Sequence, residues 1–274
     1  MAQGRALPLQ AALVASGASG GSLRSYASVG TSSTTASAGA PKVVVFGGRG
    51  FVGSNICKEA ASHGLSVLGV SRGGTPPICR DSWVDSVSWV RGNALEPQSF
   101  VEHLEGASAV ISCVGGFGSQ QEQLRTNGAA NVSLIEAARA AGVPRFVFIS
   151  AAPFNIPGIE MLLGGYIRGK AAAEEALRTH FPTSGVALRP GVIYGDRDVS
   201  TNVTLPLGLF FKPYSQLVEK VPNAKSLSEL PLVGAALVPP VSVTTVARAA
   251  VRAATDPSVP AGVIDVWALA DEDH

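Results

Sequence analysis

Short apolar runs rich in β-branched residues alternate with Ala-rich amphipathic stretches along most of this chain. Apolar runs bounded by turn residues are typical of strands, and apolar positions spaced three and four apart are typical of helices. Strands that alternate with helices predict right-handed crossovers and a doubly wound parallel sheet of the α/β class. The strands are predicted at Val43–Phe46, Ser66–Ser71, Val87–Arg91, Ala109–Cys113, Arg145–Ser150, Val186–Arg189 and Gly262–Trp267, and the helices at Val52–His63, Leu124–Ala141 and Val243–Ala254.

A glycine-rich segment joins the first predicted strand to the first predicted helix. Glycines let the backbone turn sharply and approach phosphates, while the helix N-terminus offers N–H groups and a positive dipole end. A strand, a glycine turn and a helix in this order are typical of the dinucleotide-binding Rossmann fold. The residues predicted to bind the cofactor pyrophosphate are Gly47, Gly48, Arg49, Gly50, Phe51, Val52 and Gly53.

The second predicted strand ends at Ser71 and is followed by Arg72, with no acidic residue between Val67 and Arg80. NAD sites usually place Asp or Glu here to bind the ribose hydroxyls, whereas NADP sites use Arg for the 2′-phosphate. Arg49 inside the glycine turn is a second candidate for that phosphate. We therefore expect NADP(H) to be the bound cofactor, with NAD(H) as the alternative. The other interpretation of Arg49 and Arg72 is that they are solvated surface charges.

Two further turns are predicted to face the adenosine half of the cofactor. Asn93 follows the third strand and is a candidate adenine contact. Val114, Gly115 and Gly116 follow the fourth strand and would let the backbone approach the adenosine. The alternative for these two glycines is an ordinary turn.

Tyr166 and Lys170 are four residues apart in a helical pattern, so they share one helix face. An ammonium at this spacing is expected to lower the pKa of the phenol and make it a proton donor or acceptor beside a nicotinamide. The alternative is a packed tyrosine and a solvated lysine.

Residues 1–40 contain Arg5 and Arg24, no acidic residue and many Ala, Ser, Gly and Thr. This composition is typical of an organelle transit peptide, and a tail without function is the alternative. Arg24-Ser-Tyr26 before Ala27 is similar to a mitochondrial processing pattern, although the Ser and Thr content also suits a plastid address. We expect a mitochondrial location, with the plastid as the alternative, and a single domain over residues 41–274.

The chain has 21 basic and 20 acidic residues, and removing residues 1–26 would change its net charge from +1 to −1. A near-neutral domain argues against nucleic acid as a partner. The three cysteines and four histidines are scattered, so neither a disulfide framework nor a metal site is predicted. No transmembrane segment is predicted, because the longest uncharged stretch, residues 230–247, contains three prolines.

The alternation of strand and helix ends after Gly195. Residues 196–240 are rich in proline and include the apolar cluster Leu205–Phe211. We expect a small substrate cap of short helices and loops there. A hydrophobic substrate is expected with it, and a quinone-like compound is one candidate.

Six segments follow one another along the chain: Gly47–Gly53, Asn127-Gly128 with Asn131, Phe146–Ser150, Tyr166–Lys170, Arg189–Gly195 and Pro240–Val243. With these segments the chain resembles the extended and atypical branches of the short-chain dehydrogenase/reductase superfamily over residues 42–268. It also resembles a plant and algal group of organellar NAD(P)-binding Rossmann proteins. That group is related to the fungal mitochondrial reductase of coenzyme Q synthesis and, more distantly, to the Rossmann-type accessory subunit of respiratory complex I.

The resemblance implies catalytic roles for Tyr166, Lys170 and Ser150 and a cofactor-side role for Asn127. The superfamily usually has a Ser or Thr just after the fifth strand, but here Ser150 is followed by Ala151-Ala152-Pro153, so Ser150 stands early. Two hypotheses follow: an NADP-dependent oxidoreductase, or a dinucleotide-bound scaffold in a mitochondrial quinone-synthesis or respiratory complex. A third option is a redox sensor that reports NADPH status by reshaping the cap.

Overall fold

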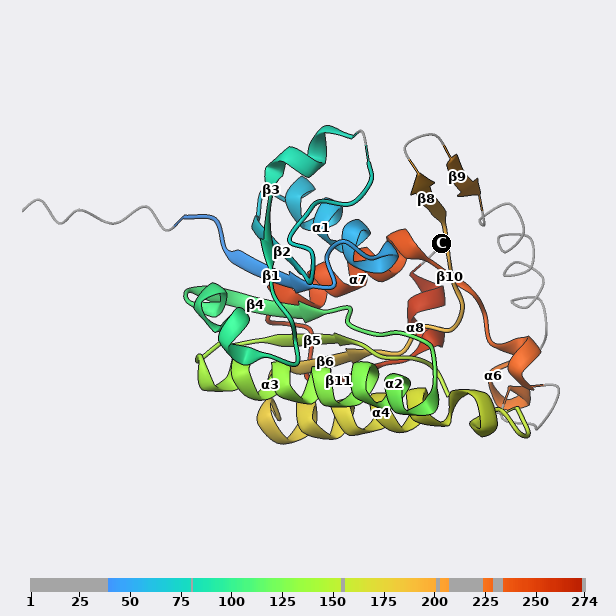
Figure 1. Ribbon diagram of the computed structural model, residues 1–274. Coiled ribbons are helices and arrows are strands. Elements are labelled where there is room, and N and C mark those ends of the chain that lie inside the picture. The colour runs from blue at the N-terminus through green and yellow to red at the C-terminus, as the bar shows by residue number, and fades with distance from the viewer. Residues whose placement is uncertain are drawn as a thin grey trace, which may run out of the picture. The chain divides into compact units, whose positions relative to one another are not determined.

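The computed structural model describes residues 39–79, 81–153, 156–200, 203–206, 224–228 and 234–272. Its centre is a seven-stranded sheet in which all the pairings are parallel (Figure 1). The strand order is β11-β6-β5-β4-β1-β2-β3. The strands β2 and β3 are therefore added on one side of β1, and the strands from β4 onward are added on its other side. This is the doubly wound Rossmann topology that the sequence predicted. The strands are β1 (Lys42–Phe46), β2 (Ser66–Ser71), β3 (Val87–Arg91), β4 (Ala107–Ser112), β5 (Phe146–Ile149), β6 (Gly185–Leu188) and β11 (Gly262–Ile264).

Helices cover both faces of the sheet. Figure 1 shows α1 (Phe51–Ser62) and α7 (Val243–Thr255) above it, and α3 (Ala130–Ala140) and α4 (Glu160–His180) below it. The other α-helices of the described residues are α2 (Gln120–Leu124), α6 (Ala224–Leu227) and α8 (Val266–Asp271).

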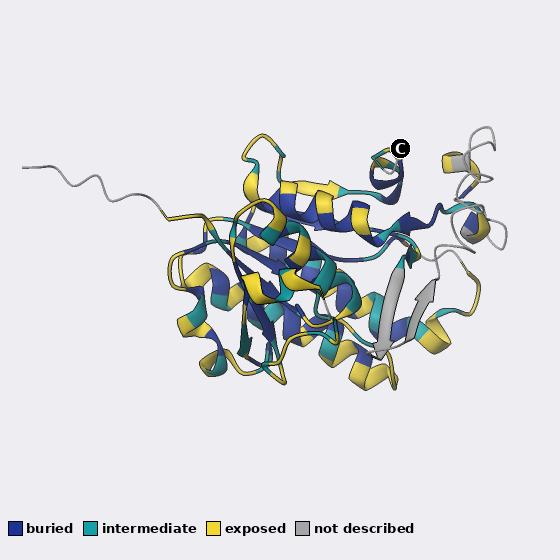
Figure 2. Ribbon diagram, turned by 90° about the horizontal axis from the view of Figure 1, so that it is seen from above, coloured by how far each residue is buried: buried dark blue, intermediate teal, exposed yellow. Residues whose placement is uncertain are grey.

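Alternate residues of β1 feed two separate hydrophobic layers. Val43 and Val45 pack with α1 and α7, whereas Val44 and Phe46 pack with α3 and α4. All four are at most 1% exposed. Burial on both faces explains why the strand is apolar from Val43 to its end. Figure 2 shows buried residues along the strands and exposed residues on the outer helix faces.

Two predicted elements have an end that differs from the structure by more than two residues. The last strand was predicted to run to Trp267 but ends at Ile264, because the Asp265 carboxylate accepts hydrogen bonds from the Trp267 and Ala268 amides and caps α8. The helix predicted over Leu124–Ala141 instead begins at Gln120. It contains a π-helical turn at Arg125–Ala129 before α3.

The segment predicted to form the substrate cap is described only in part. Short strands β7 (Ile193–Tyr194) and β10 (Val241–Ser242) pair in parallel, and β8 (Asp196–Ser200) and β9 (Val203–Pro206) pair in antiparallel fashion. The apolar cluster Leu205–Phe211 and residues 1–38 of the predicted transit segment lie outside the residues whose side chains are described. No helix among the described residues is long and apolar enough to cross a membrane.

Candidate dinucleotide and catalytic site

The glycine turn between β1 and α1 is shaped by positions where a side chain would not fit. Gly47 has φ +77°, and a Cβ there would lie 3.0 Å from the Cys113 carbonyl oxygen. A Cβ on Gly53 would lie 2.2 Å from the Gly47 carbonyl oxygen, so α1 can lie close to the turn only with glycine at this position. The Gly47 amide donates to the Val70 carbonyl at 2.9 Å, which ties the turn to β2.

Helix α1 begins at Phe51 without a side-chain cap, because its N-cap is Gly50. The first N–H groups of a helix have no partners within the helix and favour an anion. The turn therefore fits a pyrophosphate in two respects: its backbone can be approached closely, and its N–H groups and dipole favour negative charge.

A pocket of about 1060 Å³ opens beside this turn at the carboxyl ends of β1 and β2. Known ligand sites fill roughly 300–1,000 Å³, so there is room for a large ligand. Of the predicted cofactor residues, the pocket is lined by Gly47, Arg49, Gly50, Phe51, Ser71, Arg72, Asn93, Val114 and Gly115. The others, Gly48, Val52, Gly53, Gly116, Asn127 and Lys170, lie outside its lining, as do Tyr166 and Ser150.

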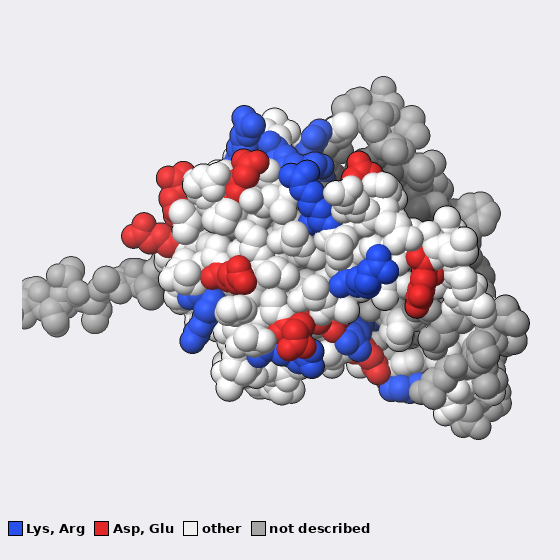
Figure 3. Space-filling view, turned by 60° about the horizontal axis from the view of Figure 1, so that its bottom comes forward, with Lys and Arg blue, Asp and Glu red and all other residues white. Residues whose placement is uncertain are grey.

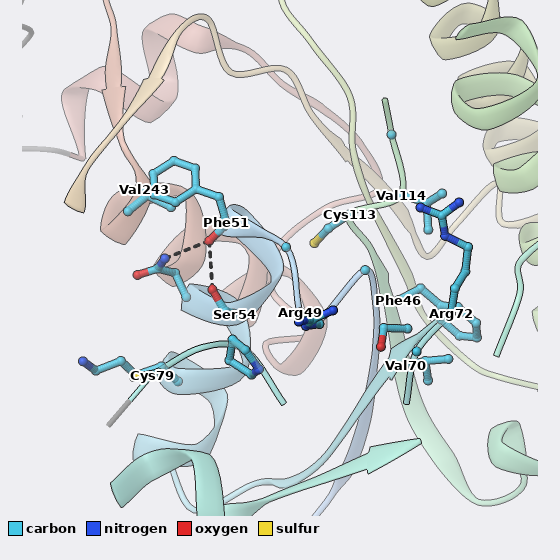
Figure 4. A pocket seen from close by; sticks show the side chains of 18 of the residues that line it. Phe46, Arg49, Phe51, Ser54, Val70, Arg72, Cys79, Cys113, Val114 and Val243 are labelled. Atoms are coloured by element: carbon cyan, nitrogen blue, oxygen red, sulfur yellow. Dashed lines mark hydrogen bonds between the residues drawn. The ribbon is translucent and has the colours of Figure 1, made fainter. Parts of the chain in front are cut away.

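Arg49 and Arg72 both line the pocket and are both exposed (Figure 4). Lys58 also lines it and pairs with Asp81 at 2.9 Å, with both side chains about half exposed. Asp81 is the carboxylate among the described lining residues, so the lining carries more positive than negative charge. The electrostatics of the pocket favour an anionic ligand.

Polar side chains organise the turns around the adenosine side. The Ser71 hydroxyl accepts from the Gly74 amide at 3.1 Å. The Asn93 side chain donates to the Glu96 carboxylate at 2.7 Å and accepts from the Leu95 amide. These bonds hold the turns after β2 and β3 against the pocket, and direct contact of Asn93 with an adenine remains a prediction.

Two buried asparagines hold the loop after β4. The Asn127 amide donates to the Gly116 carbonyl at 2.8 Å and its oxygen accepts from the Gly116 amide at 3.2 Å. The Asn131 amide donates to the Val114 carbonyl, while the Ser112 hydroxyl donates to the Asn131 oxygen at 2.6 Å. Asn127 lies in the π-helical turn, a feature often found at functional sites. Asn127 therefore holds the backbone of the loop after β4 in place, and this loop borders the pocket.

Tyr166 and Lys170 lie on α4, as their spacing predicted. The Lys170 ammonium donates to the Ile149 carbonyl at 2.7 Å and lies 5.8 Å from the centre of the Tyr166 ring. A Cβ on Gly115 would lie 3.5 Å from Lys170 Nζ, so the lysine borders the pocket through a residue that lines it.

The pKa shifts of this pair differ from the expected pattern. Burial lowers the pKa of Lys170 to about 8. Burial raises the pKa of Tyr166, where the sequence led us to expect a lowered pKa. The phenol therefore stays protonated at neutral pH.

Ser150 is 4% exposed, and its hydroxyl donates to the Glu174 carboxylate. Glu174 in turn accepts from Arg189, whose Nε lies 2.9 Å from Oε1. The structure thus joins Ser150 to an ion pair, and the role of Glu174 was missed from the sequence. The signal was present, because Glu174 follows Lys170 by four residues, the same spacing that separates Lys170 from Tyr166.

Tyr194, Gly195 and residues 242–244 also line the pocket, although they were not assigned to it from the sequence. All lie in or beside the segments Arg189–Gly195 and Pro240–Val243. The presence of these two segments in that order was the sequence feature that could have assigned these residues to the pocket. These segments form β7 and β10, which pair with each other and place both stretches at the pocket.

The fold and the glycine turn define a dinucleotide-binding Rossmann protein. A family model described as NAD(P)H-binding matches residues 47–212, which is more than half of the chain. The chain therefore belongs to the NAD(P)H-binding family.

The chain is also similar to several known proteins. An uncharacterised chloroplastic protein of Arabidopsis thaliana is 44% identical over 216 residues, covering 78% of this chain and 72% of that protein. MIOREX complex component 2 of Saccharomyces cerevisiae is 38% identical over 79 residues, covering 27% of this chain and 28% of that protein. The 2-alkyl-3-oxoalkanoate reductase of Stenotrophomonas maltophilia is 28% identical, covering 57% of this chain and 52% of that enzyme.

Among solved structures, the Bordetella bronchiseptica enzyme WbmH in complex with NAD⁺ matches with a TM-score of 0.57 and 21% identity, covering 82% of this chain and 74% of that chain. The UDP-glucose 4-epimerase of Brucella ovis in complex with NAD matches with a TM-score of 0.56 and 22% identity, covering 83% and 77%. At this identity the likeness shows the fold, and the fold alone does not specify a reaction.

Proposed function

We propose that this protein is an NADP(H)-dependent oxidoreductase that reduces a carbonyl group on a hydrophobic substrate. The observation that carries the proposal is that Lys170 borders the dinucleotide pocket through Gly115 and shares one face of α4 with Tyr166. In this proposal the Tyr166 phenol is the proton donor beside a bound nicotinamide. The nicotinamide supplies or accepts a hydride when it is bound.

In this proposal each residue of the site has a separate role. The glycine turn binds the pyrophosphate, and Arg49 and Arg72 bind the 2′-phosphate that distinguishes NADP from NAD. Tyr166 donates a proton to the substrate oxygen, and Lys170 orients the ribose and the phenol. Because burial raises the pKa of Tyr166, the phenol is protonated at neutral pH, which favours the direction of carbonyl reduction.

Apolar side chains beside Tyr166 support a hydrophobic substrate. Phe117 is 75% exposed and stacks on the Tyr166 ring with centroids 5.5 Å apart, and Met161 and Leu162 are 81% and 71% exposed. The Gln123 amide donates to both the Gly118 and Leu162 carbonyls, which brings the loop that carries Phe117 beside the start of α4.

Two substrate classes fit this apolar surface. The name of one relative describes the reduction of a 3-oxo compound that carries an alkyl chain. The resemblance to the coenzyme Q reductase supports a quinone-like ring with an isoprenoid or alkyl tail. A panel of both classes, assayed by NADPH oxidation, distinguishes them.

The first test is calorimetric titration of the protein with NADPH, NADP⁺, NADH and NAD⁺. We expect NADPH and NADP⁺ to bind more tightly than NADH and NAD⁺. Binding of none of the four would reject the proposal.

The second test concerns catalysis. Replacing Tyr166 with Phe should lower turnover by about 10²–10⁴-fold, because a positioned proton donor contributes about this much, while NADPH affinity stays within about threefold. Full activity in Tyr166→Phe would rule out the phenol as the proton donor.

A second candidate function is a dinucleotide-bound scaffold of a protein complex. The engagement of Ser150 by Glu174 favours it, because this hydroxyl proton is already donated within the protein. A relative named as a complex component also supports it. Purification of the tagged protein from organelles, followed by size measurement, tests this candidate: co-purification with a large assembly is expected, and a protein recovered only by itself would count against it.

An organellar location is part of the proposal, and two compartments have separate support. The relative described as chloroplastic supports the plastid. The Arg24-Ser-Tyr26 pattern supports the mitochondrion, which stays a prediction. A fusion of residues 1–40 to a fluorescent protein would show which organelle imports it, and diffuse fluorescence would reject both.

A further inference from the structure

Glu174 is the point where two strand ends are joined to α4. Its carboxylate accepts hydrogen bonds from Ser150, which follows β5, and from Arg189, which follows β6. The Glu174 side chain is 12% exposed and the Arg189 side chain 38% exposed. Partial burial opposes ionisation of Glu174, but the bonds from Arg189 and Ser150 outweigh it and hold the pKa of the carboxyl below its ordinary value. Glu174 is therefore negatively charged at neutral pH.

The same helix face carries the proposed catalytic pair. Tyr166, Lys170 and Glu174 follow one another at four-residue spacing along α4. Lys170 donates to the carbonyl of Ile149, and Glu174 accepts from the side chain of the next residue, Ser150. Two successive residues at the end of β5 are thus bonded to two successive turns of α4.

Lys170 is buried, with 9% of its surface exposed. The described groups that face it are Cys113 from the end of β4, the Phe148 ring of β5 at 4.6 Å, and Tyr166 and Glu174 on its own helix. Burial raises the pKa of Cys113 to about 12 and that of Tyr166 above its ordinary value, so both are neutral where Lys170 titrates. Glu174 is the ionised group among them.

We propose that Glu174 is a positioning residue for Lys170: its carboxylate, held by Ser150 and Arg189, keeps the buried ammonium charged and directed at the carboxyl end of β5. The functional meaning of this role rests on the oxidoreductase function proposed above. It also gives Ser150 a different task from the one expected. A hydroxyl has one proton, and Ser150 donates it to Glu174, so toward a substrate this oxygen can only accept.

The experiment is an NMR titration of the protein labelled with ¹³C at lysine Cε, with Lys170→Met identifying the Lys170 resonance. The wild-type resonance is expected to titrate near 8, well below the ordinary lysine value of about 10.4. In Glu174→Gln the midpoint should fall by about one pH unit, because a nearby negative charge is removed. The matched control is Glu175→Gln, since Glu175 is exposed on the adjacent position of α4 and pairs with Arg178.

An unchanged Lys170 midpoint in folded Glu174→Gln would overturn the proposal, as would an equal fall in Glu175→Gln. If Glu174→Gln does not fold because it leaves Arg189 unpaired, the double variant Glu174→Gln/Arg189→Gln takes its place and is compared with Arg189→Gln, so that the two proteins differ only in the Glu174 charge, and the Lys170 midpoint should again fall by about one pH unit. Arg189→Gln alone keeps the carboxylate, so the Lys170 midpoint should not fall, and a fall would also overturn the proposal.

The titration is read without cofactor or substrate, so it is decided separately from the proposed function. If NADPH oxidation is also found, the alkaline limb of its pH profile should move to lower pH in Glu174→Gln and stay in place in Glu175→Gln. An unshifted limb together with a shifted Lys170 midpoint would reject the catalytic use of Lys170 and leave the role of Glu174 intact.

Discussion

The cofactor side of the pocket and the proposed catalytic side around Tyr166, Lys170 and Ser150 are built from different kinds of group. The cofactor side combines backbone groups, namely a glycine-rich turn and a helix N-terminus without a side-chain cap, with exposed arginines around an open pocket. The catalytic side depends on buried side chains that bind one another or the backbone, with Lys170 on Ile149 and Ser150 on Glu174. Cofactor binding should therefore fail through steric changes, and catalysis through changes of charge and hydrogen bonding.

The charges on the face drawn in Figure 3 do not separate into a cofactor side and a catalytic side. Figure 3 shows Lys, Arg, Asp and Glu side chains of both signs on one face, separated by wide uncharged areas. The two cations that matter for the comparison, Arg49 and Arg72, instead lie at the pocket.

The largest expected effect is steric. Replacing Gly53 with Ala places a Cβ 2.2 Å from the Gly47 carbonyl oxygen, so the turn or α1 must shift. We expect a loss of about 3 kcal/mol in the free energy of unfolding, measured by urea denaturation, and loss of NADPH binding. Gly50→Ala is the matched control in the same turn, since its Cβ would lie 3.2 Å from that oxygen, and it should cost less than about 1 kcal/mol. Equal effects of the two variants would contradict the steric account.

The second effect concerns the buried charge of the catalytic side. The folded pKa of Lys170 is about 8 and its unfolded pKa is near 10.4, so the unfolded chain binds more protons between these values. This lysine therefore makes stability rise with pH through that window, by up to about 3 kcal/mol.

Lys170→Met removes this contribution. The free energy of unfolding of the variant should exceed that of wild type by the largest amount up to about pH 8, and this difference should shrink as the pH approaches 10.4. Unfolding free energies of both proteins, measured in reducing buffer across this window, give the difference directly. Parallel stability curves would show that the charge of Lys170 is not suppressed by burial.

A smaller effect tests the charges of the cofactor side. Arg49→Ala and Arg72→Ala should each weaken NADPH binding about tenfold, because each removes a cation from the 2′-phosphate, and should leave NADH binding within about twofold. Arg139→Ala, an exposed position at the end of α3, is the control. Equal losses for NADPH and NADH would mean that the arginines act on the pyrophosphate instead.

The smallest effect concerns the Phe117 ring. Phe117→Ala removes a near-parallel stack, 8° between planes, and exposes Tyr166. We expect a stability loss below about 1 kcal/mol and a fall of the Tyr166 pKa toward its ordinary value, because burial is what raises it. Ultraviolet titration, with Tyr166→Phe to isolate the signal, measures the shift, and Phe117→Trp should preserve the raised pKa.

Much of the cofactor side could be predicted from the sequence because its signals are local. The apolar run of β1, the glycines after it and Arg72 after β2 each indicate their role within a few neighbouring residues. The pocket is lined by Arg72 and, from the glycine turn, by Gly47, Arg49, Gly50 and Phe51, and their part in cofactor binding stays a prediction.

The start of α2 carries an equally local signal that periodicity alone does not use. Ser119 accepts from the Glu122 amide and Glu122 accepts from the Ser119 amide, which forms a capping box. The apolar pattern placed the helix start at Leu124, whereas this box places it at Gln120. Capping residues therefore locate a helix end more closely than the spacing of apolar positions does.

The catalytic side was harder to predict because its contacts join distant residues. Ser150 and Glu174 are 24 positions apart, and the position of Ser150 in the sequence does not show which group takes its proton. The raised pKa of Tyr166 likewise depends on burial by the whole fold, whereas the four-residue spacing shows only that Lys170 is near. Local periodicity predicts which residues share a face, and packing decides their protonation.

The contact between the π-helical turn and α4 fixes the position of the pocket loop relative to Tyr166 and Lys170. A Cβ on Gly128 would lie 3.0 Å from the Gly169 Cα, and a Cβ on Gly169 would lie 2.8 Å from the Gly128 amide nitrogen, so the two backbones touch. Asn127, beside Gly128, holds the pocket loop, and Lys170, beside Gly169, holds the end of β5. A methyl group at either glycine would act as a wedge between the two helices and would tilt Tyr166 and Lys170 away from the pocket, although it touches neither the cofactor turn nor the phenol.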